Sequence, residues 1–304
     1  MGQVSKFRVV GGQAAQTAAR VASTDGEHPA VIVGDIVSRP RPRGHVITLA
    51  NEKGGVGKST LAFHLCVALC DAGYRVAAID LDRRQQTLAR GLAHRNGTAR
   101  RLGIALPSPS CVVLHQPSGA MLHQEIARVG WDCDYVIIDA PGHDSPIARR
   151  AIAIADTLVT PVNSSFVDID LLGEFDPVTL RFKKVGYFAG LVADLSEERL
   201  RQRRARIDWV VAPNRVRQGN SRNQDNVDSA LLRLAPRAGF RLASGLSERV
   251  AFRELALLGL THMDLKRIPQ FAKAGGRANH EVQRLVSDLA LPQRADEAAL
   301  FEPA

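Results

Sequence analysis

The sequence predicts an α/β fold, with a doubly wound, mostly parallel sheet and helices on both faces, in a single domain. Short apolar runs recur along the chain, and each is followed by a segment suited to a crossover helix. A glycine-rich turn joins the first of these runs to the first helix. The runs are apolar throughout rather than alternating, which is typical of parallel strands covered on both faces.

The expected strands and helices follow from these runs. We expect strands at residues 45–50, 75–80, 135–139, 157–161 and 207–211. The first crossover helix is predicted over residues 59–71, and Gly73 suits its end because glycine readily takes the left-handed conformation. A last helix is predicted near residues 279–290, where apolar residues recur at helical spacing and indicate core packing.

The domain is predicted to cover residues 44–290, between two terminal segments. Residues 1–43 end in alternating arginine and proline, which disfavours a helix, so they indicate a flexible N-terminal arm. Within that arm, residues 30–37 are apolar enough to form a weakly predicted strand. Residues 291–304 are interpreted as a C-terminal tail.

Composition narrows the class of protein. The chain has 304 residues, of which 45% are hydrophobic, enough for a full core. No apolar run approaches the length of a membrane span, and the first residues lack a secretion signal. The four cysteines form no CxxC pair, and Cys66 and Cys70 are expected to fill a helix face. We therefore expect a cytoplasmic protein in a reducing compartment.

Positive charge is concentrated in one stretch. Residues 181–253 contain 16 Lys and Arg against 7 Asp and Glu, which equals the net charge of +9 for the whole chain. A run of this kind is either a solvated arginine-rich face or a surface that binds a polyanion.

The strongest motif is KGGVGKST at residues 53–60, directly between the first strand and the first helix. Its glycines allow backbone N–H groups to turn toward phosphate oxygens, and the helix presents its positive end to the same phosphates. Lys58 is expected to reach the β- and γ-phosphates of ATP, and the Ser59 hydroxyl to bind Mg²⁺. The predicted nucleotide-binding residues of the loop are Gly54, Gly55, Val56, Gly57, Lys58, Ser59 and Thr60. The strict pattern has glycine where this chain has Glu52, so the loop is a variant form.

Three aspartates follow neighbouring predicted strands. Asp139 ends the run at residues 135–139, and Asp80 and Asp82 end the run before it in the chain. Strands of such sheets bind ligands at their carboxyl ends, where a carboxylate either holds Mg²⁺ or orients an attacking water. The alternative for each is a helix N-cap. Predicted Mg²⁺ ligands are Ser59, Asp80 and Asp139.

Lys53 is a second lysine on the same loop. One lysine suffices for the phosphates that the chain itself binds. Lys53 is therefore either solvated or directed at another target.

The run KGGVGKST resembles the deviant Walker A motif of the ParA/MinD superfamily of P-loop ATPases, whose first lysine reaches across a dimer to the partner's ATP. Further motifs resemble one branch, the MipZ family of division-site positioning ATPases, and the resemblance covers roughly residues 46–265. Those motifs lie at residues 51–53, 79–82, 84–85, 139–142, 165–168, 176–179, 208–211, 214–215 and 253–255.

The resemblance implies roles for individual residues. Lys53 would be the lysine that crosses the dimer, Asp82 the residue needed for hydrolysis, and Asp80 a neighbour of the metal. Asn214 would contact adenine. With Lys58, the implied catalytic set is Lys53, Lys58 and Asp82, and the implied activity is slow ATP hydrolysis that depends on dimerisation.

The resemblance also implies partners. The monomer would interact with a ParB-like centromere-binding protein at the chromosome origin. The ATP-bound homodimer would spread over DNA on the nucleoid and inhibit polymerisation of FtsZ, the tubulin-like division protein.

The arginines that follow the Asn214 strand are the expected DNA-binding residues. Binding should be non-specific and salt-dependent, because counterion release requires no sequence reading, and two patches in a dimer would add by avidity. The candidates are Arg215, Arg217, Arg222, Arg233, Arg237, Arg241 and Arg249. A denser arginine cluster at residues 199–206 is either part of this surface or a solvated helix face.

Four alternative functions differ from this one in the features they require. A ParA-type ATPase for chromosome or plasmid partition is the main alternative. A MinD-like membrane ATPase is disfavoured, because residues 291–304 contain three acidic residues and one arginine rather than a basic amphipathic helix. An iron–sulfur relative would need paired cysteines. A non-catalytic DNA-binding scaffold is disfavoured because all the site residues are present.

Overall fold

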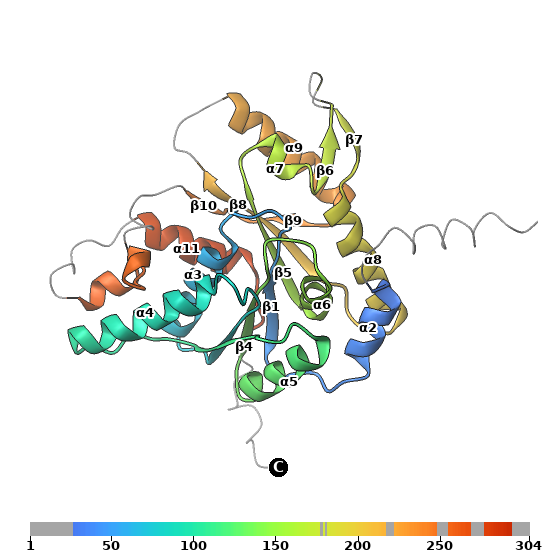
Figure 1. Cartoon of the computed structure of the whole chain (residues 1–304). Coiled ribbons are helices and arrows are strands. Elements are labelled where there is room, and N and C mark those ends of the chain that lie inside the picture. Colours follow the sequence, from blue (N-terminus) through green and yellow to red (C-terminus); the bar gives the residue numbers. More distant parts are fainter. Residues whose placement is uncertain are drawn as a thin grey trace, which may run out of the picture.

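A central sheet of eight strands with helices on both faces organises the chain (Figure 1). The computed structural model describes residues 27–176, 179, 181–216, 222–247, 255–268 and 277–293. The strands of this sheet are β1 (His45–Leu49), β2 (Val76–Asp80), β3 (Ser110–Val113), β4 (Tyr135–Asp139), β5 (Thr157–Asn163), β8 (Asp208–Val216), β9 (Arg241–Leu242) and β10 (Leu246–Ser247). β6 (Gly173–Phe175) and β7 (Phe182–Val185) form a separate antiparallel pair.

The strand order is β10-β8-β5-β1-β4-β2-β3, and β9 also pairs with β8. All pairings in this sheet are parallel. β1 lies in the middle, with β4 on one side and β5 on the other. The chain thus leaves β1 for β2 on one side and later returns to β5 on the other, and such a reversal of strand order is where doubly wound sheets bind ligands.

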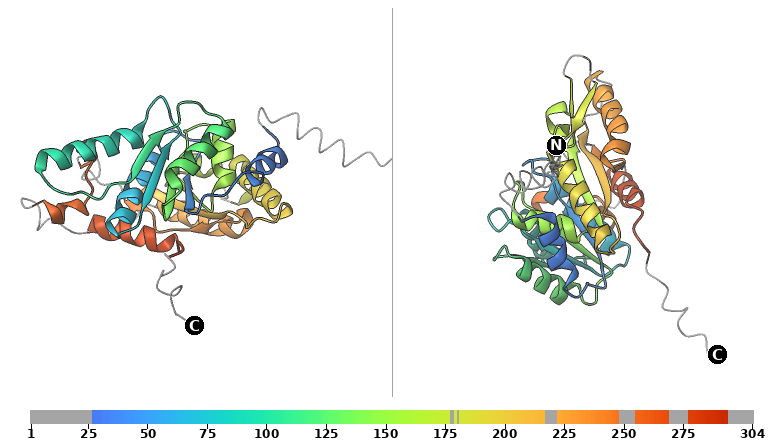
Figure 2. Two further views of the ribbon diagram at one scale, coloured as in Figure 1. Left: turned by 90° about the horizontal axis from the view of Figure 1, so that it is seen from below. Right: turned by 90° about the vertical axis from the view of Figure 1, so that its right-hand side faces the viewer.

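Helices cover the two faces of the sheet as separate layers (Figure 2). One layer holds α3 (Lys58–Asp71), α4 (Thr87–Leu102) and α11 (Arg277–Asp288), which share a core cluster. The other holds α5 (Gly119–Gly130), α6 (Pro146–Ile154), α8 (Tyr187–Arg201) and α9 (Arg222–Ala238). In the described ranges, no helix has the length and hydrophobicity needed to cross a lipid bilayer.

The apolar strands form the core that the sequence predicts. Every residue of β2 and β4 is buried, because helices cover both faces of these strands. The helix expected at residues 59–71 is α3, and Cys66 on it is fully buried, with Cys70 packed against the same cluster. Val282, Leu285 and Leu289 are buried, which confirms the core-facing C-terminal helix.

The strand predicted at residues 30–37 is wrong, because Pro29–Val37 form a helix, α2. The His28 side chain accepts a hydrogen bond from the Ala30 N–H, and proline at the first helical position is already set to the helical φ. Ile32 and Val33 are buried where α2 packs against α6 and α8. This part of the predicted flexible arm is therefore folded onto the domain. Residues 1–26 lie outside the described residues, and the domain boundaries stay a prediction.

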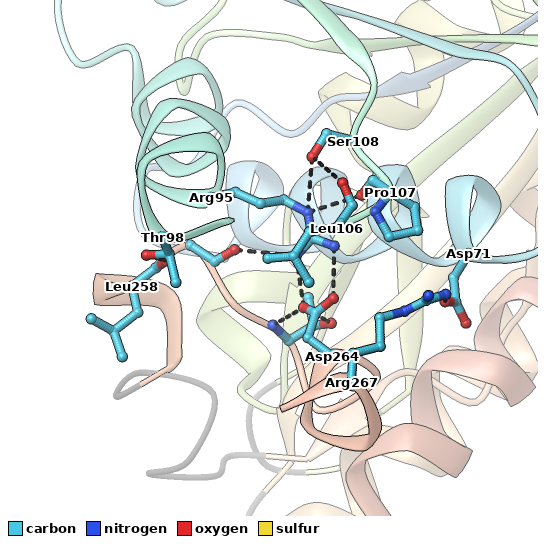
Figure 3. A network of polar contacts seen from close by, with 11 residues as sticks. Asp71, Arg95, Thr98, Leu106, Pro107, Ser108, Leu258, Asp264 and Arg267 are labelled. Carbon is cyan, nitrogen blue, oxygen red and sulfur yellow. Dashed lines mark hydrogen bonds and ion pairs between the residues drawn. The ribbon is translucent and has the colours of Figure 1, made fainter. Parts of the chain in front are cut away.

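A buried ion pair joins α4 to the segment at residues 255–268 (Figure 3). The Arg95 guanidinium donates to both carboxylate oxygens of Asp264 at 2.7 Å, and both side chains are almost fully buried. Arg95 also donates to the Pro107 carbonyl, and Asp264 accepts from the N–H and hydroxyl of Thr261. These hydrogen bonds replace the hydrogen bonds to water that the two charged groups lose on burial.

We expect Asp264→Asn to lower the free energy of unfolding by about 3–5 kcal/mol, because it leaves the Arg95 charge buried and unpaired. Urea unfolding monitored by circular dichroism measures this. The matched control is Glu125→Gln, which removes the carboxylate that pairs with exposed Arg128 and should cost less than about 1 kcal/mol. Equal losses in the two variants would show that the buried pair does not stabilise the fold.

Candidate nucleotide-binding site

The glycine-rich loop joins the carboxyl end of β1 to the start of α3, as the sequence predicts. Gly57 precedes the first residue of α3 and has a φ of 91°, in the left-handed region. A Cβ at Gly57 would lie 2.2 Å from Nδ2 of Asn214. Conformation and packing therefore both require glycine at this position.

Lys58 is held inward over this loop. Its side chain is buried at 7% exposure, and its Nζ donates to the Lys53 carbonyl at 3.1 Å. Gly142, in the loop after β4, leaves room for it, since a Cβ there would lie 3.2 Å from Nζ. Burial lowers the pKa of Lys58, while the charges of Asp139 and Asp82 oppose that shift. An anion bound in the loop would compensate the lysine charge in this poorly solvated place.

Asp139 and Asp80 lie side by side, because the parallel register of β2 and β4 pairs them directly. Both carboxylates are buried. Asp139 accepts a hydrogen bond from the Ser59 side chain, and burial, only partly opposed by this bond, raises its pKa to about 7. Its Oδ1 has no hydrogen-bond partner among the described residues. A divalent cation beside Ser59 would satisfy that oxygen and favour the ionised carboxylate.

Asp80 and Asp82 shape the turn that leads into α4. Oδ1 of Asp80 accepts from the Asp82 N–H at 3.0 Å, and Oδ2 accepts from the Ala89 N–H at 3.1 Å. Burial raises the pKa of Asp80, and these backbone bonds oppose that shift. Asp82 is less buried and accepts from the N–H groups of Arg84 and Gln85. Asp80 thus holds the turn that positions Asp82. The predicted role of Asp80 as a Mg²⁺ ligand stays a prediction.

These residues fit a nucleoside triphosphate with Mg²⁺. The loop offers N–H groups and Lys58 for phosphates, while Ser59 and Asp139 offer oxygen ligands to a cation. In the described part of the chain, no three or more His, Cys, Asp or Glu side chains are grouped to hold a metal. Phosphates and water would therefore complete the shell, as is usual for Mg²⁺.

The Lys53 side chain contacts α7 (Phe166–Ile169). Its Nζ donates to the Val167 carbonyl and lies 3.6 Å from the Asp168 carboxylate, both on α7. The two lysines of the motif therefore have separate surroundings, Lys58 buried over the loop and Lys53 half-buried against α7.

Two asparagines brace the loop. Asn214 donates to the Val56 carbonyl at 2.7 Å, which ties the end of β8 to the loop, and its contact with adenine stays a prediction. Asn51 accepts from the Lys53 N–H and donates to the Pro161 carbonyl at the end of β5. The sequence identified Asn214 as a site residue but did not predict that it braces the loop, because Asn214 and Val56 are far apart in the chain.

A charged cluster beside the loop was not predicted. Glu52 is half-buried, and its Oε1 is buried without a hydrogen-bond partner in the described residues. Burial raises its pKa to about 7, the charge of Asp144 adds to this, and Arg149 opposes it. Arg149 is buried, donates to Asp144 at 2.7 Å and to the Tyr187 hydroxyl at 2.8 Å. The signal in the sequence was the pair Arg149 and Arg150 within α6, whose other residues are apolar.

The predicted DNA-binding arginines are only partly placed by the structure. Arg233 and Arg237 lie exposed on α9, and the Arg237 guanidinium stacks on the Phe182 ring at 5.4 Å. Arg241 is bound by both oxygens of Asp208, so its charge is paired within the fold and it is not a free cation. Arg217 and Arg249 lie outside the described residues, and of Arg215 and Arg222 only the backbone is described.

The arginine cluster at residues 199–206 is not one solvated face. Arg199 is buried and donates to the carbonyls of Ala153 and Ala155. Arg201 pairs with Glu198 at 3.1 Å. Arg203, Arg204 and Arg206 remain as the outer part of the cluster.

Fold and site together define a P-loop ATPase of the ParA/MinD type. The parallel sheet, the loop after β1 and the paired aspartates are its parts. The family model for the ATPase MipZ matches residues 45–293. The chain belongs to the MipZ family.

Relatives agree with this assignment. The chain is 29% identical over 205 residues to the chromosome-partitioning ATPase Soj of Thermus thermophilus, a match of 56% of this chain and 82% of Soj. It is 30% identical over 168 residues to the septum site-determining protein MinD of Helicobacter pylori, covering 46% of this chain and 62% of MinD. The chain is therefore an ATPase of the class that includes partitioning and positioning proteins.

A solved structure shows the same fold. The apo form of McdA from Cyanothece superposes with a TM-score of 0.59 at 17% identity, covering 82% of this chain and 100% of McdA. A further McdA structure, in complex with ATP, has a TM-score of 0.57 at 16% identity and covers 84% of this chain and 100% of that one.

Glu52→Gln should change how stability without nucleotide depends on pH. The folded protein holds a proton on Glu52 up to about pH 7, whereas the unfolded chain releases it near 4.5. Stability from this group is therefore present at low pH and is lost as pH rises from about 4.5 to about 7. The variant should have a higher melting temperature than the wild type above pH 7 and show little difference near pH 4.5.

Thermal unfolding across this pH range measures the effect. Glu174→Gln, which changes an exposed glutamate paired with Lys184, is the control and should follow the wild-type curve. A Glu52→Gln curve parallel to the wild type would show that Glu52 ionises normally in the folded protein.

Proposed function

We propose that this ATPase switches between a monomer and a dimer in which two ATP molecules are sandwiched between the subunits. The position of Lys53 carries the proposal. Lys58 is buried over the loop, where it would bind the chain's own phosphates, whereas the Lys53 ammonium contacts α7. A lysine placed there is available to the nucleotide of a second copy.

The surface around Lys53 supports this arrangement. Val167 on α7 is 70% exposed, and Tyr187 at the start of α8 is 53% exposed. An exposed apolar and aromatic surface beside an active-site loop suits an interface with another subunit. In the proposed dimer, Lys53 exchanges its contacts with α7 for phosphate oxygens of the partner's ATP.

Hydrolysis would end the dimeric state. Mg²⁺ beside Ser59 and Asp139 would stabilise negative charge on the phosphates when bound. Asp82, on the turn held by Asp80, is proposed to orient the attacking water. Slow turnover would give the dimer a lifetime long enough to act before it dissociates.

Lys53→Ala should abolish the dimer without abolishing ATP binding. In an Asp82→Ala background, which is expected to block turnover, the protein with Mg²⁺ and ATP should elute as a dimer and the protein with ADP as a monomer. Adding Lys53→Ala should give a monomer in both, because no lysine then reaches across the interface, while Lys58 remains. Size-exclusion chromatography with light scattering reads out mass, and a fluorescent ATP analogue reads out binding.

The matched control is Lys266→Ala in the same background. Lys266 likewise contacts one aspartate, Asp71, but it is more exposed than Lys53 and lies at the far end of α3 from the loop. This variant should dimerise like the parent. A Lys53→Ala protein that still dimerises with ATP would refute the sandwich.

We also propose that the dimer binds DNA without sequence preference. Arg233 and Arg237 on α9 supply exposed cations, and the basic stretch at residues 181–253 contains them. One such patch would bind phosphates weakly, and a dimer would double it, so DNA retention would report the ATP-bound state.

Arg233→Glu should weaken ATP-dependent retention on duplex DNA in the Asp82→Ala background. The slope of log affinity against log salt should fall by about one for each phosphate that the protein no longer neutralises. Fluorescence anisotropy over a salt series measures both quantities. Arg284→Glu, an exposed arginine on α11 on the other face of the sheet, should leave them unchanged. Unchanged affinity and slope in Arg233→Glu would remove α9 from the DNA surface.

Within the MipZ family assignment, we propose that the cycle positions the division site. The monomer would bind a ParB-like protein at the chromosome origin, and the DNA-bound dimer would inhibit FtsZ assembly nearby. The similarity to Soj favours a second candidate, a partition ATPase that moves chromosomes or plasmids. Pelleting of FtsZ polymers with the ATP-bound dimer separates the two, since only the first candidate reduces the pellet.

A further inference from the structure

A second basic region lies outside the predicted DNA surface. Residues 83–124 contain six arginines and three histidines, with no lysine, aspartate or glutamate. Five of these arginines lie exposed along the turn after β2 and along α4. They are Arg83, Arg84, Arg90, Arg100 and Arg101.

These five arginines have no ion-pair partner within the described part of the chain. Elsewhere in the fold, arginines such as Arg149 and Arg241 are each bound by an aspartate. Arg101 donates a hydrogen bond to the Thr98 hydroxyl, which leaves its charge without a carboxylate partner. An exposed row of cations without ion pairs is a feature of surfaces that attract anionic partners.

Two of these arginines, Arg90 and Arg101, share one side of α4. Arg90, His94 and Arg101 are separated by four and seven residues, so they project from the same face of the helix. α4 packs near β2 and β3 at one edge of the sheet, whereas α9 packs near β9 at the other. Figure 1 shows the two helices on different sides of the molecule, so the α4 surface is separate from the α9 surface.

Exposed leucines lie at the end of this row. Leu102, the last residue of α4, is exposed, and Leu257 and Leu258 in the neighbouring segment are 77% and 46% exposed. Thr98 donates to the Leu258 carbonyl at 2.7 Å (Figure 3). Leu102 lies one turn beyond Thr98 on the same side of α4. The three leucines therefore form an apolar patch next to the basic face.

We propose that this basic face and leucine patch bind an acidic segment of a partner protein that also carries apolar side chains. Carboxylates of the segment would pair with Arg90 and Arg101, and its apolar residues would cover Leu257 and Leu258. DNA fits less well, because a phosphate backbone pairs with arginines but leaves the leucines exposed. The inference depends on neither dimerisation nor DNA binding.

Such a partner would contact an element connected to the active site. The N–H of Ala89 in the first turn of α4 is bound to Asp80, which also holds the turn containing Asp82. Further along, Arg95 fixes α4 to Asp264. A ligand that shifts α4 would therefore act on the turn that positions the proposed hydrolytic residue.

Two synthetic peptides of equal length and equal charge test the surface. One places glutamates and leucines on opposite sides of a helix, and the other replaces each leucine by serine. Fluorescence anisotropy of the labelled peptides, and of a duplex DNA, is measured with the full-length protein. The first peptide should bind at least about tenfold more tightly than the second, because only it covers the leucine patch.

Charge reversal on each helix then separates the two surfaces. Arg90→Glu/Arg101→Glu should weaken binding of the leucine-containing peptide by about tenfold or more, because pairing is replaced by repulsion, and leave ATP-dependent DNA retention unchanged. Arg233→Glu/Arg237→Glu, matched in charge, should do the opposite. Leu257→Ser should reduce binding of the leucine-containing peptide alone.

Three results would overturn the proposal. Equal binding of both peptides would show that the leucines take no part. Loss of DNA retention in Arg90→Glu/Arg101→Glu would assign the face to nucleic acid. Unchanged peptide binding in that variant, with thermal unfolding as in the wild type, would place the peptide elsewhere. Failure of the α9 variant to lose DNA would count only against the proposed DNA surface.

Discussion

The fold concentrates charge in a place with little water, and the rest of the site depends on that constraint. The parallel register places Asp80 beside Asp139, and the loop places Lys58 above them, all three buried. Burial raises the pKa of both carboxyls and lowers that of the lysine, so each group is pushed toward its neutral form. Ligands of opposite charge would relieve this penalty, which links occupancy of the site to stability of the loop and strand ends.

Hydrogen bonds of buried charged side chains also join parts of the chain that are far apart in the sequence. Asp80 uses both carboxylate oxygens on backbone N–H groups, so the turn with Asp82 and the start of α4 are held by one residue. Arg95 then joins α4 to Asp264, almost 170 residues further along. The turn that contains Asp82, helix α4 and the segment that contains Asp264 are therefore connected by hydrogen bonds. These hydrogen bonds could couple a change at α4 to the turn that contains Asp82. Such coupling would require α4 to exchange between two arrangements.

Fully buried strands and the glycine-rich loop were predictable from the sequence, because each depends on neighbouring residues. Ser110–Val113 of β3 were not, since this four-residue edge strand is only partly buried and resembles a loop. The helix that begins at Pro29 resembles a strand in its apolar sequence, but burial against two other helices decides its form. Glu52 and Arg149 are far apart in the sequence and come close only in the folded chain. A count of charges along the sequence likewise does not show that Arg241 is paired with Asp208.

The proposed dimerisation depends on the different surroundings of the two loop lysines. Moving the Lys58 side chain would cost free energy, since it is enclosed by Gly142 and the loop backbone. Lys53 is held by one carbonyl and one carboxylate at 3.6 Å near the surface, and ion pairs of that kind contribute only about 0–1 kcal/mol. Releasing it from Asp168 therefore costs little compared with the charge-assisted hydrogen bonds that a triphosphate offers. In the proposed cycle, the same loop thus holds one lysine fixed for its own nucleotide and leaves the other able to respond to a second copy of the chain.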